Sequence, residues 1–385
     1  MSKKVDAAIE KAGQRILDKR NVVGLGEAEK EKDGRKTGKK GLTVYVEAKV
    51  AKNRIREQDL IPKIVEGVRT DVVVLERSEA LPLHEGFEDR FDGWRRPFMM
   101  GDEIGPTYHL QCGTIGMISR IPFVGWTAQD IGLTNWHVLH SPFTEQIDIL
   151  DHHVSQPGWP KHGQPAPEFI GKVFAHSTLD PTTPYNKVDA AFFTLEKPGG
   201  NPRKPAPGWN APGSFWDGQI DAITQRGYLK DAGGAHLLGW PHYHANFAAL
   251  IRDINAPGGF RPQPLGLGTV EIGDRVWKSG RTTGVTTGTV MATNYNCGVS
   301  YGGKLGIVRF TKQLMVRRDD DFNDPEVIVS PGDSGSGVFD ETGNLVGLLF
   351  AGGKKHYIAN VIQTVFLEVL EGIDEVFNLN REATS

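Results

Sequence analysis

The spacing of apolar residues divides the chain near residue 100. At the amino terminus they recur every three or four positions, which predicts an amphipathic helix; they are Val5, Ile9, Ala12 and Ile16. Residues 42–50 (LTVYVEAKV) alternate apolar with polar side chains, and residues 72–75 (VVVL) form a short apolar run, so both segments are predicted strands. Residues 55–66 carry apolar side chains around Leu60 that predict a short helix.

A charged run, EAEKEKDGRKTGKK, occupies residues 27–40. Its simplest interpretation is a solvated hairpin loop, and the alternative is a contact surface for a partner. A GxG lies just before it, but neither a third glycine nor an apolar helix follows, which argues against dinucleotide binding. Residues 1–80 are therefore interpreted as a small α/β domain with a regulatory or assembly role. Residues 81–100 mix Pro, Gly and charge without a period and are interpreted as a linker.

From about residue 100 the pattern changes to short alternating or apolar runs separated by turn signals, such as GLTNWHVL, VDAAFFTL and LVGLLFAGG. This cadence is typical of an all-β sandwich or barrel, here assigned to residues 101–378. Residues 198–265 are rich in Pro, Gly and Trp and are interpreted as an insertion. Residues 358–377 predict a packed terminal helix, because apolar residues recur at helical spacing at Ile362, Val365, Phe366, Val369, Leu370 and Ile373.

The composition narrows the classes of function. Lys+Arg 44 against Asp+Glu 47 gives a net charge of −3, which argues against nucleic-acid or membrane binding driven by bulk charge. Two cysteines exclude a disulfide scaffold and a Cys-rich zinc module. No run approaches the ~20 apolar residues of a membrane span, and no apolar segment follows the basic start as in a secretory signal. The expectation is a protein of the reducing cytoplasm.

The segment SPGDSGSGVF, residues 330–339, is the most informative in the chain. A nucleophilic serine needs its hydroxyl presented on a tight turn, and an oxyanion hole needs backbone N–H groups that converge without a side chain in the way. Glycine supplies both, because it adopts conformations closed to other residues. Ser334 lies among three such glycines: Gly332, Gly335 and Gly337.

Two further segments carry residues suited to work with such a serine. His137 lies in LTNWHVL, at the end of a short apolar run, and Asp189 opens the apolar run VDAAFFTL. A lone histidine there is more often structural than catalytic. A carboxylate at the start of a buried strand needs a partner, so Asp189 is either a strand-edge cap or the partner of a histidine.

Taken together, His137, Asp189 and Ser334 follow the chain order of the chymotrypsin-like serine proteases. TNWHVL, VDAA and GDSGSG resemble the three triad motifs of that family, and VWKSGRTTGVTTGTV (276–290) resembles the strand and turn that precede its serine. The resemblance covers about residues 100–375 and is to the bacterial trypsin-like (S1-type) serine peptidases, in an intracellular branch with an N-terminal α/β segment. It implies a double six-stranded β-barrel with a C-terminal helix.

The resemblance also implies roles for individual residues. Ser334 would attack the scissile carbonyl, His137 would act as general base and acid, and Asp189 would orient the histidine. The backbone amides of Gly332 and Ser334 would form the oxyanion hole. The strand LLFAGG would pair with the substrate backbone, and the predicted substrate-binding residues are Ile328, Phe350, Ala351 and Gly352.

The sequence departs from the family at several positions. Val138 stands where secreted animal members have a cysteine, so Cys112 lacks the familiar neighbouring partner. Cys112 and Cys297 could pair only with one another, and two free thiols are the favoured alternative. About a hundred residues precede the first protease strand, so Asp333 is expected to pair with a group other than a new amino terminus. Ile328 is uncharged, which argues against cleavage after Lys or Arg and favours an apolar or small residue before the cut. Phe350 replaces a small polar residue of the substrate strand.

Other candidate sites are weaker. His152 and His153, and a histidine cluster in the insertion, form no HExxH and no metal-ligand spacing, so neither a metal nor another cofactor is expected. The aromatic residues of the insertion are interpreted as a small satellite core, with gating of the cleft or partner binding as the alternative; they are Trp209, Phe215, Trp216, Trp240, Tyr243 and Phe247.

The leading hypothesis is a serine endopeptidase acting on a protein or peptide, with a regulatory protein or self-association engaging the N-terminal domain. The alternatives are a catalytically silent binding or scaffold module, a latent protease that needs a partner for activation, and an esterase using the same triad. No nucleic-acid or membrane partner is expected.

Overall fold

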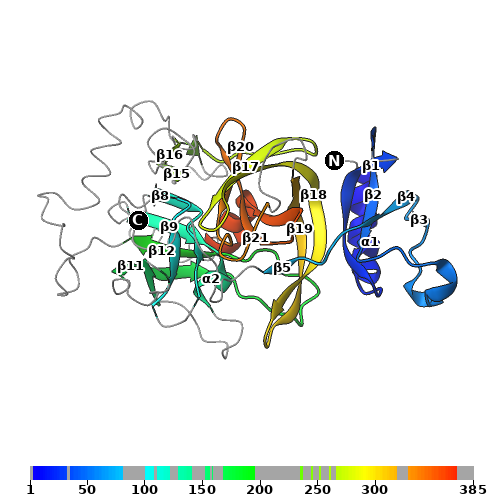
Figure 1. Ribbon diagram of the computed structural model, residues 1–385, viewed down its shortest axis with the longest axis horizontal. Coiled ribbons are helices and arrows are strands. Elements are labelled where there is room, and N and C mark those ends of the chain that lie inside the picture. The colour runs from blue at the N-terminus through cyan, green and yellow to red at the C-terminus, as the bar shows by residue number, and fades with distance from the viewer. Residues whose placement is uncertain are drawn as a thin grey trace, which may run out of the picture.

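The computed structural model describes residues 3–32, 35–80, 100–107, 111–121, 129–140, 152–156, 158, 168–195, 235–236, 244–245, 251–252, 260–261, 266–318 and 328–370. Within them the protein is mainly β, as the sequence predicts. Most strands belong to two antiparallel-rich sheets, each curled into a barrel (Figure 1).

The N-terminal unit is a helix packed on a sheet. Helix α1 (Lys3–Leu17) covers β1 (Val22–Lys32), β2 (Arg35–Val46) and β4 (Val68–Val74), and a short β3 (Ile64–Val65) extends the sheet (Figure 1). The apolar stripe of the predicted helix is buried against strand residues, as its spacing requires; the cluster includes Val5, Ile9, Ala12, Ile16, Leu25, Leu42 and Val44.

Two local predictions in this unit are wrong. Residues 27–40 are not a loop: β1 and β2 run through most of them, because register partners such as Glu29 and Lys40 bring opposite charges face to face and let the strands extend. The helix predicted for 55–66 is replaced by two single 3₁₀ turns, η1 (Lys52–Arg54) and η2 (Glu57–Asp59), followed by β3. Pro62 cannot donate a backbone hydrogen bond, which ends helical propagation there.

The first barrel is built from β6 (Glu103–Pro106), β7 (Gly113–Thr114), β8 (Met117–Ile121), β9 (Gln129–Thr134), β10 (His153–Gln156), β11 (Glu168–His176) and β12 (Ala191–Leu195). Their order is β7-β6-β10-β11-β12-β9-β8. Because β7 and β8 are consecutive halves of one extended stretch, the sheet closes into a six-stranded ring. A one-turn helix, α2 (Trp136–Leu139), leaves the end of β9.

The second barrel contains β17 (Arg275–Gly280), β18 (Gly284–Gly302), β19 (Gly306–Arg318), β20 (Gly337–Asp340), β21 (Leu345–Gly352) and β22 (His356–Val361). The order β17-β20-β21-β22-β19-β18 is closed by a further β17–β18 pairing, so this ring is also six-stranded. The double-barrel fold implied by the resemblance is therefore confirmed.

The predicted terminal helix begins at residue 362 rather than 358, because residues 356–361 form β22. The apolar residues of the helix over 362–370 are buried in the main core: Ile362, Val365, Phe366, Val369 and Leu370. Ile373 lies outside the described residues.

The N-terminal unit and the second barrel share one sheet. In β1, Gly24 and Leu25 are the register partners of Cys297 and Asn296 in β18. Glycine is needed at position 24 for this contact, because a Cβ there would lie only 2.1 Å from the Tyr295 hydroxyl oxygen. A further two-residue strand, β5 (Glu79–Ala80), pairs with β18 and β21.

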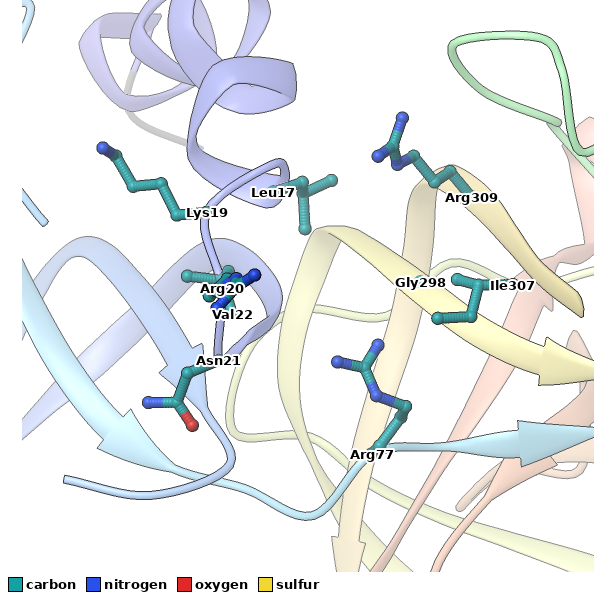
Figure 2. Close-up of a pocket in the computed structure, with 9 residues that line it drawn as sticks. All are labelled: Leu17, Lys19, Arg20, Asn21, Val22, Arg77, Gly298, Ile307 and Arg309. Carbon is teal, nitrogen blue, oxygen red and sulfur yellow. The ribbon is translucent and has the colours of Figure 1, made fainter. Parts of the chain in front are cut away.

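A pocket of about 290 Å³ lies at this junction, between the end of α1 and the β18–β19 hairpin (Figure 2). Its lining includes four basic residues: Lys19, Arg20, Arg77 and Arg309. Arg309 forms an ion pair with Asp18 across the junction at 2.6 Å, and Arg77 pairs with Glu47 within the N-terminal unit at 2.9 Å.

The predicted insertion, 198–265, is described only at β13 (Ala235–His236), which pairs with β14 (His244–Ala245), and at β15 (Ile251–Arg252), which pairs with β16 (Phe260–Arg261). The six aromatic residues named for its satellite core and the linker up to residue 99 lie outside the described residues. Cys112 and Cys297 are both buried and are not joined in a disulfide, as predicted. In the described part of the chain, no helix combines the length and apolar character that crossing a membrane requires.

Candidate active site

The three predicted catalytic residues come from both barrels. His137 lies in α2, directly after β9, and Asp189 lies just before β12, so the first barrel supplies the base and its partner. Ser334 lies on the turn that precedes β20 of the second barrel. All three residues are fully buried.

His137 and Asp189 are joined by a short hydrogen bond. Asp189 Oδ2 lies 2.5 Å from His137 Nδ1, and Asp189 Oδ1 accepts the backbone N–H of His137 at 3.1 Å. The backbone around Asp189 is held in turn, because Asn135 and Asn360 donate to its carbonyl at 2.7 and 3.0 Å. This carboxylate fixes the imidazole with Nδ1 protonated, which leaves Nε2 as the basic nitrogen.

A third donor to the Asp189 carboxylate is one that the sequence analysis missed. The Tyr301 hydroxyl, from β18 of the second barrel, donates to Asp189 Oδ2 at 2.6 Å. Its ring meets the His137 ring edge to face at 5.6 Å. Burial, together with the nearby Asp189 charge, raises the pKa of Tyr301 well above its ordinary value, so the hydroxyl keeps its proton. Nothing in the surrounding residues, VSYGG, marks this tyrosine as part of a site.

The serine and the histidine are not hydrogen-bonded to each other. The Ser334 hydroxyl donates to the backbone carbonyl of Phe350 at 3.2 Å, and His137 Nε2 has no hydrogen-bond partner within the described part of the chain. A buried imidazole nitrogen without a partner is unusual and marks a group that is kept for another acceptor or donor.

The turn that carries Ser334 depends on its glycines. Gly332 and Gly335 have φ of +95° and +91°, a region that other residues rarely adopt. A Cβ on Gly335 would lie 2.1 Å from the carbonyl oxygen of Thr114. Thr114, in β7, also binds the turn directly, since its N–H donates to the Ser334 carbonyl at 2.7 Å and its hydroxyl to the Gly332 carbonyl at 2.8 Å. The first barrel therefore fixes the position of the nucleophile turn.

The two backbone amides predicted to form the oxyanion hole are those of Gly332 and Ser334. Within the described residues, neither N–H donates to another backbone carbonyl, whereas the intervening Asp333 N–H donates to Ser330 at 3.0 Å.

Asp333 pairs with Lys278, a partner that the sequence did not identify. Lys278 Nζ lies 3.0 Å from Asp333 Oδ2, and both side chains are fully buried. The same carboxylate accepts the N–H groups of Thr282 and Thr283 at 3.0 and 3.1 Å. The expectation that Asp333 pairs with an internal group is therefore met by a lysine on β17, at the start of the segment that resembles the strand before the serine.

The turn after β17 also links the two barrels. Arg281 Nε donates to Glu103 Oε2 at 2.8 Å, and the Arg281 N–H donates to the Thr114 hydroxyl at 3.1 Å. Arg281 is only 1% exposed and Glu103 2%, so this is a buried ion pair across the barrel interface.

The predicted substrate-binding residues occupy three different environments. Ile328 is buried in the core of the second barrel. The Phe350 ring packs on Phe310 at 4.7 Å between ring centroids. Ala351 and Gly352, which were expected to pair with a substrate, are paired with Ala80 and Glu79 of β5.

Among the described residues, no group of three or more histidine, cysteine, aspartate or glutamate side chains is arranged to hold a metal ion. His152 and His153 are both described; His153 begins β10, and its ring packs on Phe169 with ring centroids 4.6 Å apart.

Comparison with solved structures gives matches at low sequence identity. No family model matches the chain, and no curated protein matches it either. A solved glutamic-acid-specific serine protease is 15% identical, with a TM-score of 0.38, and the match covers 71% of this chain and 98% of that one. Nocardiopsis protease is 16% identical, with a TM-score of 0.38, and the match covers 70% of this chain and 95% of that one. The MamO protease domain of Magnetospirillum magneticum is 10% identical, with a TM-score of 0.30, and the match covers 69% of this chain and 94% of that one.

Proposed function

We propose that the protein is a serine endopeptidase that cleaves peptide bonds through Ser334, His137 and Asp189. The observation that carries the proposal is the buried His137–Asp189 pair, whose imidazole Nε2 has no hydrogen-bond partner among the described residues. One nitrogen of His137 is therefore bonded to a carboxylate and the other is open to a donor, which is the state that a general base needs. The buried His356 also has an Nδ1 without a hydrogen-bond partner among these residues, but its other nitrogen faces the Ser78 hydroxyl instead of a carboxylate.

The chemistry follows from the groups present. Rotation of the Ser334 side chain away from the Phe350 carbonyl would bring its hydroxyl proton to His137 Nε2 as the oxygen attacks a substrate carbonyl. Asp189, held by Tyr301, would stabilise the imidazolium that forms. The Gly332 and Ser334 amides would bind the developing oxyanion, and loss of such a donor typically lowers the rate by ~10²–10³. His137 would then protonate the leaving amine, and water would release the acyl group.

The test is covalent labelling of the nucleophile. A fluorophosphonate probe is expected to modify Ser334, identified by peptide mapping, and the protein is expected to digest an unfolded protein such as reduced casein. Ser334→Ala should remove both signals. Ser336→Ala is the matched control, because Ser336 is equally buried on the same turn but its hydroxyl donates to the Asp333 carbonyl, at 2.6 Å. Labelling at another residue, or equal digestion by Ser334→Ala, would contradict the proposal.

One observation favours a second candidate, a binding module without turnover. The Ser334 hydroxyl points to the Phe350 carbonyl rather than to His137, and Ser334 is fully buried. Complete absence of labelling in a folded protein, under all conditions including after release of any bound segment, would support this alternative.

A further inference from the structure

Strand β5 pairs with two strands of the second barrel, β18 and β21, beside the nucleophile turn. Glu79 is aligned with Ser300 of β18, and on the other side Ala80 and Glu79 are the antiparallel partners of Ala351 and Gly352 in β21. The opposite edge of β21 is already paired with β22. The edge taken by β5 is therefore the one that this end of β21 leaves for another strand.

That edge lies next to the candidate nucleophile. Ser334 Oγ is bonded to the carbonyl of Phe350, the residue before Ala351. The following turn residue, Gly335, donates to the Leu349 carbonyl at 2.9 Å. A peptide that presents a carbonyl to Ser334 must be extended beside this part of β21, where main-chain hydrogen bonds can hold it. Residues 79–80 lie in this position.

The segment leading into β5 is anchored on both sides. The Ser78 hydroxyl is 2.8 Å from His356 Nε2, and the Ser78 carbonyl accepts the N–H of Ser300 at 3.1 Å. Ser78 is 3% exposed and Ala80 9%, and Ala80 belongs to the main core cluster. Figure 1 shows β5 leaving the N-terminal unit and running towards β18 and β21.

We propose that residues 78–80 are an autoinhibitory strand that occupies the substrate-docking edge of β21. The inference rests on the proposed peptidase function and names the regulation of the same site. The ligand for this edge is an extended polypeptide. It must displace residues 78–80, which are part of the same chain and therefore compete at an effective concentration of about millimolar, as for a short flexible link. The active form then needs β5 to leave β21.

The test weakens β5 without touching the triad. Because the Ser78 carbonyl points to β18, the backbone N–H of Glu79 points to β21, and Glu79→Pro removes that donor. Ala51→Pro is the matched control: it adds a proline to the same unit at an exposed position whose φ is already −59°. Ser78→Ala is a milder second variant that removes only the bond to His356.

Two readouts are needed. The first is the rate at which a tripeptide diphenyl phosphonate, which must lie extended to react, modifies Ser334. If the open form is at most about 10% populated, Glu79→Pro should raise this rate at least tenfold and Ser78→Ala should raise it less. Ala51→Pro should match the wild type. The second readout is hydrogen exchange of the amides over 345–353, which should quicken in Glu79→Pro.

Equal labelling rates in the wild type and Glu79→Pro, with faster exchange in the variant, would overturn the proposal. Unchanged exchange over 345–353 in a folded Glu79→Pro would also overturn it, because β5 would then not shield β21. If a small fluorophosphonate labels none of the chains, the peptidase function itself fails, and the exchange measurement still decides whether residues 78–80 cover this edge.

Discussion

Lys278→Met tests whether a buried charge pair holds the nucleophile turn. The substitution keeps an unbranched side chain of similar length but leaves the Asp333 carboxylate buried without its cation. Removing one partner of a buried ion pair costs about 3–5 kcal/mol. Asp333 retains the amides of Thr282 and Thr283, so the lower end of that range, about 3 kcal/mol, is expected.

Thermal and urea unfolding measure this loss. At about 2–4 °C per kcal/mol for a large domain, the melting temperature should fall by about 6–12 °C. Activity should fall as well, because Asp333 lies between the two residues whose amides are proposed to bind the oxyanion. Adding Asp333→Asn to Lys278→Met should lose less stability than the two single changes together, by at least about 1 kcal/mol, since the residues are in contact.

The control is Arg309→Met. Arg309 pairs with Asp18 at 2.6 Å, but the two side chains are 37% and 50% exposed, so its loss should cost less than about 1 kcal/mol. If Lys278→Met proves as mild as Arg309→Met, the buried pair does not stabilise the turn and the reasoning is refuted.

Three further predictions concern the site and its surroundings. Tyr301→Phe removes a hydrogen bond to a carboxylate worth about 1.5–3 kcal/mol, so kcat/KM should fall about tenfold to a hundredfold because Asp189 is no longer held from the second barrel; an unchanged kcat/KM in a folded variant would contradict a positioning role. Gly335→Ala forces a side chain into a backbone oxygen at φ +91° and should abolish labelling, with a large drop in melting temperature; a stable, labelled variant would contradict the argument for this turn. Burial lowers the pKa of His356 to about 4, so the folded protein keeps this histidine neutral. The folded state therefore loses stability as the pH falls from about 6.5 towards 4, by about 3 kcal/mol in all. Unfolding free energies measured between pH 7 and 5 should show this slope in the wild type and not in His356→Gln.

The parts of the site that could be predicted are those encoded by local sequence. The turn around Ser334 needs glycines at fixed positions, and His137 and Asp189 each adjoin a recognisable strand. A few neighbouring residues are therefore enough to predict each of the three. Tyr301 and Lys278 carry none, because their partners lie 112 and 55 residues away along the chain and the contacts depend on how the barrels close.

The same distinction holds for the fold. The amphipathic spacing of α1 and the cadence of the barrel strands are periodic, and both were predicted. Strand β5 has two residues and no period, and its partners Ala351 and Gly352 are far along the chain, so only the assembled sheet reveals it. The ladder of β1 and β2 through 27–40 was missed because charged residues on solvent-facing strands resemble a loop.

The ladder between β1 and β18 has a consequence for the integrity of the chain. Residues 49–54 are exposed and connect β2 to the rest of the N-terminal unit. A single cut there would not separate the pieces, because Gly24 and Leu25 stay paired with β18, and β2 stays paired with β4 beyond the cut. The protein is thus suited to fragment complementation: residues 1–50 and 51–385, produced as separate polypeptides, should reassemble into one nicked particle held by sheet hydrogen bonds and the α1 core.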